Sequence, residues 1–181
     1  ISAFQGAKHL NPHWAPDGDR LASASPDRTV RVWDITTVIT VFSFEEHEGP
    51  VNSVAWSPDG RMLALGTGEG AVDGAIIVRD TENWQVFQVL RGHEYGVGPV
   101  AWSSDSKRLA SSGPDQAIKV WDVATGEKVA EMRGHSHGPS CLAWSPDDQR
   151  IASTSNDRMV KVWDVNKKQE IDTLRGHDDG V

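Results

Sequence analysis

Residues 134–164 read GHSHGPSCLAWSPDDQRIASTSNDRMVKVWD, and this stretch decides the fold because the chain repeats its pattern. Within it, Trp144 ends a short strand-like run and opens a turn. Trp14, Trp56 and Trp102 hold the same place in earlier copies, and the four tryptophans are 42, 46 and 42 residues apart. A second series shares this period and consists of Trp33-Asp34, Arg79-Asp80, Trp121-Asp122 and Trp163-Asp164. Two independent marks with one period indicate internal repetition.

Each repeat contains four strand-like segments. In the second repeat the first segment is the apolar run at residues 51–56, and the Ser-Pro-Asp-Gly that follows has proline and glycine where turns favour them. Residues 61–66, the β-branched run 75–78 and the alternating run 84–90 are the other three. No segment has a convincing helical period. The sequence predicts an all-β chain, because a period of about 40–45 residues is typical of propeller blades of four strands.

Composition narrows the range of partners. The chain has 181 residues, a net charge of −8 and a pI near 5.3, which argue against non-specific binding to nucleic acid. No apolar run approaches the roughly 18 residues that a membrane crossing needs. The single cysteine, Cys141, cannot form a disulfide within the chain, which fits a reducing compartment. We expect a cytoplasmic protein that binds neither nucleic acid nor membrane.

Glycine-histidine pairs complete the repeated pattern. They occur at Gly92-His93, Gly134-His135 and Gly176-His177, and Glu46-His47 is a worn copy. With the Trp-Asp pairs, they make the sequence resemble the WD-repeat β-propeller family over essentially its whole length. The resemblance divides the chain into four-stranded blades at about 5–46, 47–92, 93–134 and 135–176, with 177–181 starting a further repeat or closing segment. The first copy is the most divergent, because Gln5 stands where the histidine would be.

The resemblance implies a buried polar network in each repeat. The aspartate accepts from the imidazole, the other imidazole nitrogen meets the serine hydroxyl, and the indole N–H finds an acceptor. By position in the repeats, the members are Ser23, Asp27, Trp33, His47, Asp73, His93, Ser111, Asp115, Trp121, His135, Ser153, Asp157 and Trp163. These residues are expected to be structural.

Catalysis and metal binding are poorly supported. Serine, histidine and aspartate also form hydrolase triads, but a nucleophile site is single, whereas this set recurs within one chain. Metal binding by His47, His93, His135 and His177 is not expected, because they lie about 42 residues apart, one to a repeat. The local pairs His135/His137 and His9/His13 are weak signals. The glycine-rich run at 66–70 lacks the Lys-Ser/Thr of a phosphate loop. We expect no catalytic residues, no metal and no cofactor; a hydrolase with centrally placed carboxylates is a remote alternative.

The second repeat departs from the pattern. Leu65 takes the serine position and Arg79 the closing tryptophan position, and 23 residues separate Trp56 from Arg79 where the other repeats have 19. The extra residues fall within 67–74, a loop that the resemblance places on the face most often used for partners. The candidate partner-binding residues are Asn52, Glu69, Asp73 and Tyr95. Asp73 keeps its register six residues before Arg79, so we also predict an ion pair between these two residues.

The expected function is that of a non-catalytic scaffold that binds protein or peptide partners on the loop-bearing face. Four WD-type blades would form a half ring, because their shape usually suits rings of about seven or eight. A second copy could complete an eight-bladed ring as a homodimer, or the chain could be part of a longer propeller. The alternative function is a purely structural homo-oligomerisation module.

Overall fold

The computed structural model describes residues 12–44, 49–68 and 74–181. Within these ranges the chain forms only strands, turns and loops, and the strands make four antiparallel sheets of four. The predicted all-β class with four-stranded units is confirmed. None of these residues lies in a helix with the length and apolar character that crossing a membrane requires.

Each sheet is built from four consecutive strands in chain order. The first sheet contains β1 (His13–Trp14), β2 (Arg20–Ala24), β3 (Val30–Asp34) and β4 (Ile39–Phe44), and the second contains β5 (Val51–Trp56), β6 (Met62–Thr67), β7 (Gly74–Asp80) and β8 (Val86–His93). The third contains β9 (Val100–Trp102), β10 (Arg108–Ser112), β11 (Ala117–Asp122) and β12 (Lys128–Arg133). The fourth contains β13 (Pro139–Trp144), β14 (Arg150–Ser155), β15 (Val160–Asp164) and β16 (Gln169–Leu174).

Strand register brings the repeated residues of each sheet together. In the fourth sheet Trp144 pairs with Ile151, and Ile151 pairs on its other side with Trp163. The two tryptophan series of the sequence therefore meet across a buried aliphatic residue. The turn after the first strand needs a positive φ, which glycine adopts most readily: Gly18 and Gly60 have φ values of 78° and 74° there.

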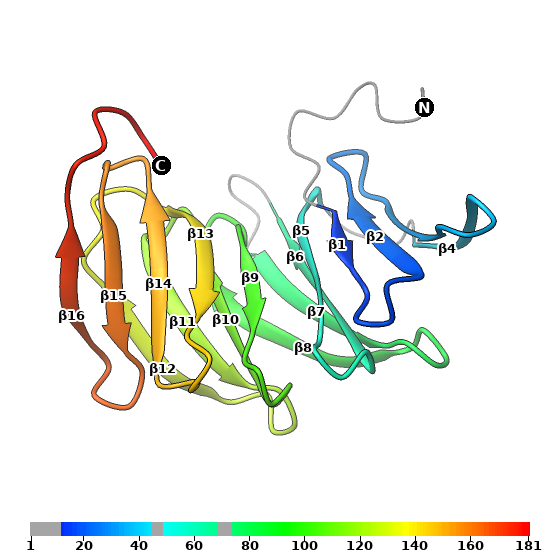
Figure 1. Ribbon diagram of the computed structural model, residues 1–181. Coiled ribbons are helices and arrows are strands. Elements are labelled where there is room, and N and C mark those ends of the chain that lie inside the picture. The colour runs from blue at the N-terminus through cyan, green and yellow to red at the C-terminus, as the bar shows by residue number, and fades with distance from the viewer. Residues whose placement is uncertain (1–11, 45–48, 69–73) are drawn as a thin grey trace.

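The four sheets follow one another around an open arc (Figure 1). The first strands of neighbouring sheets contact each other along the inside of this arc, where β1 meets β5, β5 meets β9 and β9 meets β13. Between consecutive sheets lie three apolar clusters, which include the largest buried side chains of the described chain. Packing is thus sheet on sheet, and each sheet is stabilised by its immediate neighbours.

One strand differs from its sequence-based prediction. The alternating run 84–90 was expected to be a strand, but β8 spans Val86–His93 and Trp84 lies in the preceding turn with a φ of 62°. The Trp84 ring instead stacks on Phe42 of β4, with ring centroids 5.0 Å apart. Burial of a large aromatic side chain between two sheets therefore outweighs the local alternation that favours a strand.

Candidate functional site

The third sheet contains the fullest version of the repeated polar network. His93 donates from Nδ1 to the Asp115 carboxylate at 3.0 Å. Its Nε2 lies 2.8 Å from the Ser111 hydroxyl, which also accepts the Trp121 indole N–H at 2.8 Å. The serine therefore donates to the imidazole while it accepts from the indole, which requires the Nδ1–H tautomer of His93. This network fastens the loop before β9 to the β10–β11 hairpin.

A buried lysine also belongs to this network, and the sequence reasoning missed it. Lys119 Nζ lies 2.6 Å from the Asp115 carboxylate, and both side chains are only 3% exposed. Lys119 stands directly opposite Ser111 in the β10–β11 pairing. A cationic residue holds the same place in the first and fourth repeats. That repeated charge two residues before the closing tryptophan was the signal available in the sequence.

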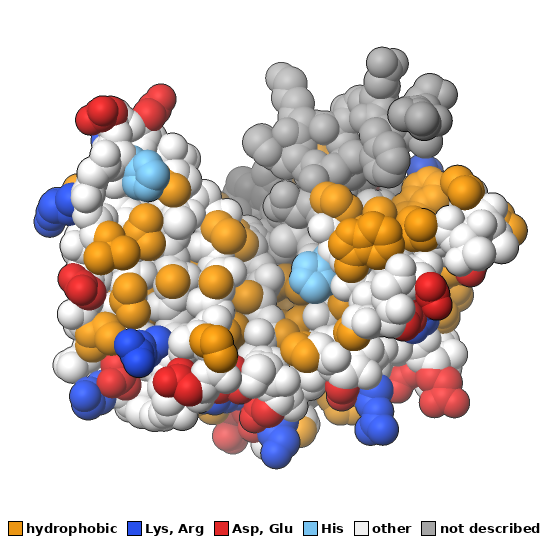
Figure 2. Space-filling model, viewed as in Figure 1, with side chains coloured by type: hydrophobic (Ala, Val, Ile, Leu, Met, Phe, Trp, Pro, Cys, Tyr) orange, Lys and Arg blue, Asp and Glu red, His pale blue; other side chains and the backbone are white. Residues whose placement is uncertain are grey.

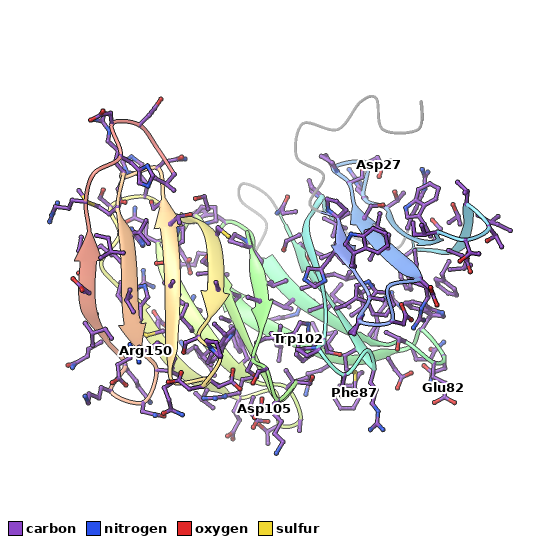
Figure 3. The ribbon with its side chains drawn as sticks, in the orientation of Figure 1. Asp27, Glu82, Phe87, Trp102, Asp105 and Arg150 are labelled. Carbon is purple, nitrogen blue, oxygen red and sulfur yellow. The ribbon has the colours of Figure 1, made fainter. Side chains whose placement is uncertain are left out.

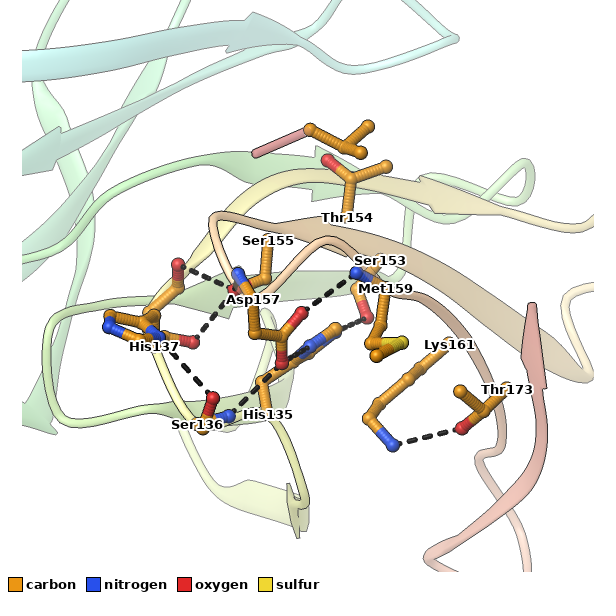
Figure 4. A network of polar contacts seen from close by, with 12 residues as sticks. His135, Ser136, His137, Ser153, Thr154, Ser155, Asp157, Met159, Lys161 and Thr173 are labelled. Carbon is orange, nitrogen blue, oxygen red and sulfur yellow. Dashed lines mark hydrogen bonds and ion pairs between the residues drawn. The ribbon is translucent and has the colours of Figure 1, made fainter. Parts of the chain in front are cut away.

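The fourth sheet repeats the network, as Figure 4 shows. His135 Nδ1 lies 2.7 Å from Asp157, and its Nε2 lies 2.8 Å from the Ser153 hydroxyl. The Trp163 indole donates to the same hydroxyl at 2.8 Å. The main-chain N–H of Ser136 also donates to Asp157, so the carboxylate orders the loop before β13. The two most complete copies of the network thus share one geometry.

The lysine of the fourth sheet has different partners from that of the third. Lys161 Nζ lies 2.8 Å from Glu170 and 2.9 Å from the Thr173 hydroxyl, both on β16. Asp157 consequently has a histidine and main-chain donors around it but no lysine contact such as Asp115 has. The same repeated carboxylate is therefore placed in two different electrostatic environments.

In the first sheet part of the network is present. The Trp33 indole donates to Ser23 at 2.9 Å. Asp27 accepts instead from the Thr29 hydroxyl at 2.6 Å and from the Thr29 main-chain N–H at 2.9 Å. Gln5, at the position of the histidine, lies outside the described residues. Asp27 is thus bound within its own turn, and its contacts there are local.

The pKa values in the third sheet follow from its buried contacts. Burial raises the pKa of the Asp115 carboxyl, but hydrogen bonds and charge from His93 and Lys119 outweigh it and hold the pKa well below its usual range. Burial lowers the pKa of His93 and outweighs the opposing hydrogen bond from Asp115. The Asp115 carboxyl is therefore ionised at neutral pH, and burial favours the uncharged imidazole of His93.

This arrangement supports structure rather than chemistry. The hydroxyls of Ser111 and Ser153 each bind an imidazole and an indole, and both serines are buried. A serine nucleophile needs access to a substrate and an oxyanion site beside it. Among the described residues there is also no cluster of three or more histidine, cysteine, aspartate or glutamate side chains that could hold a metal ion.

The repeated network and the four-stranded sheets agree with a comparison to protein families. The sequence matches the family described as WD domain, G-beta repeat, in four copies at residues 8–34, 39–80, 84–122 and 126–164. The chain belongs to the WD40 repeat family. Each matched WD40 copy ends at or near the closing Trp-Asp pair or at the Arg-Asp pair that replaces it.

Several curated WD40-containing relatives are similar to the chain. Protein HIR1 of Gibberella zeae is 33% identical over 141 residues, covering 65% of this chain and 14% of the relative. Protein HIRA of Dictyostelium discoideum is 28% identical over 148 residues, covering 64% and 13%. Protein HIRA of Oryza sativa subsp. japonica is 30% identical over 135 residues, covering 61% and 14%. The chain therefore spans about one seventh of the length of the relatives it matches.

The second WD40 repeat has neither the serine nor the closing tryptophan of the polar network. Leu65 is fully buried at the serine position. The Arg79 guanidinium lies over the Phe44 ring, 4.2 Å from its centroid, and donates to the Trp84 carbonyl oxygen at 2.8 Å. The predicted ion-pair partner, Asp73, lies outside the described residues. His47 and Glu69, a network residue and a candidate partner-binding residue, lie outside them as well.

Asn52 and Tyr95, the other two candidate partner-binding residues, have different surroundings. Asn52 lies within β5, in the predicted strand over residues 51–56, and donates to the carbonyl oxygens of Gly68 and Val97 at 2.7 and 2.9 Å. This pairing commits Asn52 to holding two loops together. Tyr95 is 55% exposed and has a φ of 67°, a backbone region that few residues other than glycine adopt.

Proposed function

We propose that the chain is a non-catalytic scaffold that binds a protein or peptide partner at its loop edge. The loop edge is the rim of the arc along which β5, β9 and β13 begin. It is uppermost in Figure 1. Membership of the WD40 family supports a scaffold role. The chain shares its repeats and fold with that family, and in such proteins the rigid sheets hold loops that carry the function. The partner is a protein or peptide rather than nucleic acid, since the net charge is −8.

The observation that carries this proposal is the placement of Tyr95 on a firmly held loop. Two residues beyond it, the Val97 N–H donates to the Thr67 carbonyl oxygen at 3.0 Å, and the Val97 oxygen accepts from Asn52. Gly98 N–H donates to the Ser112 carbonyl oxygen at 2.7 Å. An exposed aromatic ring on an already ordered loop loses little entropy when it binds, and tyrosine is enriched among residues that dominate interfaces.

Selection of binding peptides from a displayed random library tests the proposal. We expect enriched peptides whose affinity for Tyr95→Ala is at least about tenfold weaker, the loss of a modest interface anchor. Phe87→Ala is the matched control, because Phe87 is an exposed aromatic residue on the outer strand β8 (Figure 3). A failure to enrich any peptide, or equal binding by the Tyr95→Ala chain, would overturn the proposal.

The remote hydrolase alternative gains no support from the inside of the arc. A groove of about 400 Å³ lies there, lined by residues that include Trp102, Trp144 and Asp148. The Asp148 carboxylate accepts from the main-chain N–H and the hydroxyl of Ser104 at 2.8 and 2.7 Å. It therefore caps the turn after β9, which is a structural role. For the same chain we propose a cytoplasmic location, consistent with its single unpaired thiol.

A second candidate function is homo-oligomerisation, as a homodimer that completes an eight-bladed ring. The observation that favours it is that the first and last sheets of the arc expose apolar side chains to solvent. Leu174 of the last sheet is 51% exposed, whereas its repeat counterparts Leu90 and Met132 are each 2% exposed. An apolar side chain placed for burial but left in water indicates a missing neighbour.

A further inference from the structure

Two of the three boundaries between consecutive sheets share one contact, and Met62 stands at the arginine position of the remaining boundary, between the second and third sheets. The arginine six residues after the tryptophan of one sheet stacks on the corresponding tryptophan of the next. Arg20 lies over the Trp56 ring and Arg108 over the Trp144 ring, each 4.9 Å from the ring centroid. We call this contact, with the turn residues beside it, a seam. Each seam is directional, because the earlier sheet supplies the arginine and the later sheet the tryptophan.

The first and last sheets each contain one of the two residues that a further seam needs. Arg150 stands six residues after Trp144, and its side chain is 56% exposed. Figure 3 shows it at the lower end of β14 in the last sheet. Trp14, in the first sheet, is 53% exposed, whereas the same tryptophan in the second sheet, Trp56, is 2% exposed. The arginine therefore lacks its tryptophan at one end, and the tryptophan lacks its arginine at the other.

The turns beside the seams have matched residues. In the seam between the first and second sheets, Pro16 faces Gly60, on which an added Cβ would lie 3.7 Å from the proline ring. In the seam between the third and fourth sheets, Ser104 takes the proline position, and Asp148 replaces the glycine and binds it. At the boundary between the second and third sheets, Pro58 holds the proline position and Ser106 the glycine position, and the Ser106 hydroxyl accepts from the Asp59 N–H at 3.1 Å. Proline is therefore found with glycine at one boundary and with serine at another.

The free ends carry the proline and glycine version of this match. Pro146 of the last sheet stands where Pro16 stands in the first, and Gly18 stands where Gly60 does. A Cβ built on Gly18 would meet no atom within 4 Å, so that side of the first turn is open. The last sheet of one copy and the first sheet of another therefore contain the turn and stacking residues of the seam between the first and second sheets.

The apolar faces next to these residues are also uncovered. Four positions that are at most 5% exposed in the first sheet become partly or largely exposed in the last. The buried set is Ala22, Val30, Val32 and Phe44, and the corresponding set is Ala152, Val160, Val162 and Leu174. Figure 2 shows apolar side chains gathered over the fourth sheet and again over β1 and β2. Both end surfaces thus offer area for burial.

We propose that a second copy of this chain closes the arc by forming this seam twice. Arg150 of one copy stacks on Trp14 of the other, and Pro146 packs against Gly18 beside them. A two-fold axis makes the two seams equivalent and gives eight sheets, within the range that propellers adopt. This inference deepens the homo-oligomer candidate and does not depend on partner binding at Tyr95, so either can fail while the other holds.

The solution mass of the 181-residue chain gives the first test. Light scattering at micromolar concentration should give 39.6 kDa, twice the 19.8 kDa of one chain. Trp14→Ala and Leu174→Asp should each shift the mass toward 19.8 kDa, while the control Phe87→Ser, on the outer strand β8, should leave it at the dimer value. A monomeric wild-type chain, or a dimer indifferent to both seam variants, would overturn the proposal.

Crosslinking tests the geometry of the seam. A chain carrying Gly18→Cys and Pro146→Cys in a Cys141→Ser background should be joined into dimers by a short bismaleimide, and the two single variants should not. The positive φ of Gly18 does not preclude this change, because Ser106 and Asp148 occupy the same turn position at φ 59° and 55°. Crosslinking that is equally efficient with either cysteine alone would refute the seam even if the chain is dimeric.

Discussion

The ammonium of Lys119 and the carboxylate of Asp115 lie 2.6 Å apart, with both side chains buried beneath the loop edge. A buried charge that loses its partner is strongly destabilising. We therefore predict that Asp115→Ala lowers the free energy of unfolding by about 3–5 kcal/mol. Urea unfolding followed by tryptophan fluorescence measures this value.

Asp157→Ala is the matched comparison in the fourth sheet. Its removal strands an imidazole but no lysine, because Lys161 pairs with Glu170, so we expect a smaller loss of about 2–3 kcal/mol. Asp73→Ala, in the second repeat, which departs from the repeated pattern, should lower the free energy of unfolding by less still. If Asp115→Ala and Asp157→Ala lowered the free energy of unfolding equally, the contact between Lys119 and Asp115 would add nothing to stability.

Acid should weaken the fold in two ranges of pH. Burial lowers the pKa of His93, so its uncharged form is favoured in the folded state, and this contribution is lost as pH falls below the unfolded value of about 6.5. The pKa of the Asp115 carboxyl is also lowered, so its contribution is lost below about pH 4. Unfolding midpoints in urea, measured from pH 8 to pH 3, should fall below about pH 6.5 and again below about pH 4. In His93→Gln the decline between pH 7 and pH 5 should be shallower; an unchanged slope there would contradict the assignment.

The second sheet can be returned to the pattern of the others by two changes made together. Arg79→Trp alone would direct an indole N–H toward the Leu65 side chain, which offers no hydrogen-bond acceptor. Adding Leu65→Ser supplies the hydroxyl that Trp121 and Trp163 use in their own sheets. A double-mutant cycle should give a favourable coupling of about 1 kcal/mol, the net value of a hydrogen bond. A coupling near zero would mean that the aromatic packing around Trp84 prevents the network from forming.

Gly74 is predicted to tolerate no side chain. A Cβ there would lie 2.4 Å from both the Gly96 carbonyl carbon and the Val97 nitrogen, so two main-chain segments would have to separate. Gly74→Ala should therefore cost at least about 2 kcal/mol. Gly18→Ala is the control, since it adds backbone strain in open space and should cost about 1 kcal/mol. Thermal unfolding of both variants checks the order, and a milder effect at Gly74 would be evidence against the close approach of β7 to the Gly96–Val97 segment.

The repeated features of the fold could be predicted from sequence, whereas the departures from repetition depended on tertiary packing. The period of the tryptophans predicted the sheets, and the position of His93 in its repeat placed it beside Ser111 and Asp115. Nothing local showed that Trp84 would leave its alternating strand. Its ring is partly buried because β4 supplies Phe42 and Phe44 from another sheet. The hydrogen bonds of Asn52 were likewise not predictable from its own segment, because its partners lie on loops distant in sequence.

The three boundaries between consecutive sheets differ in the hydrogen bonds that their tryptophans make. The Trp102 and Trp144 indoles each donate to a main-chain oxygen of the preceding sheet at 3.0 Å. The Trp56 indole nitrogen is buried and has no such acceptor, and Trp56 contributes instead its main-chain N–H to His13 Nδ1 at 3.2 Å. We predict that the boundary between the first and second sheets opens more easily than that between the third and fourth, because both have the arginine stack but only the latter also has the indole hydrogen bond. Local unfolding should begin there, and amide hydrogens of β2 and β3 should exchange with solvent sooner than those of β10 and β11.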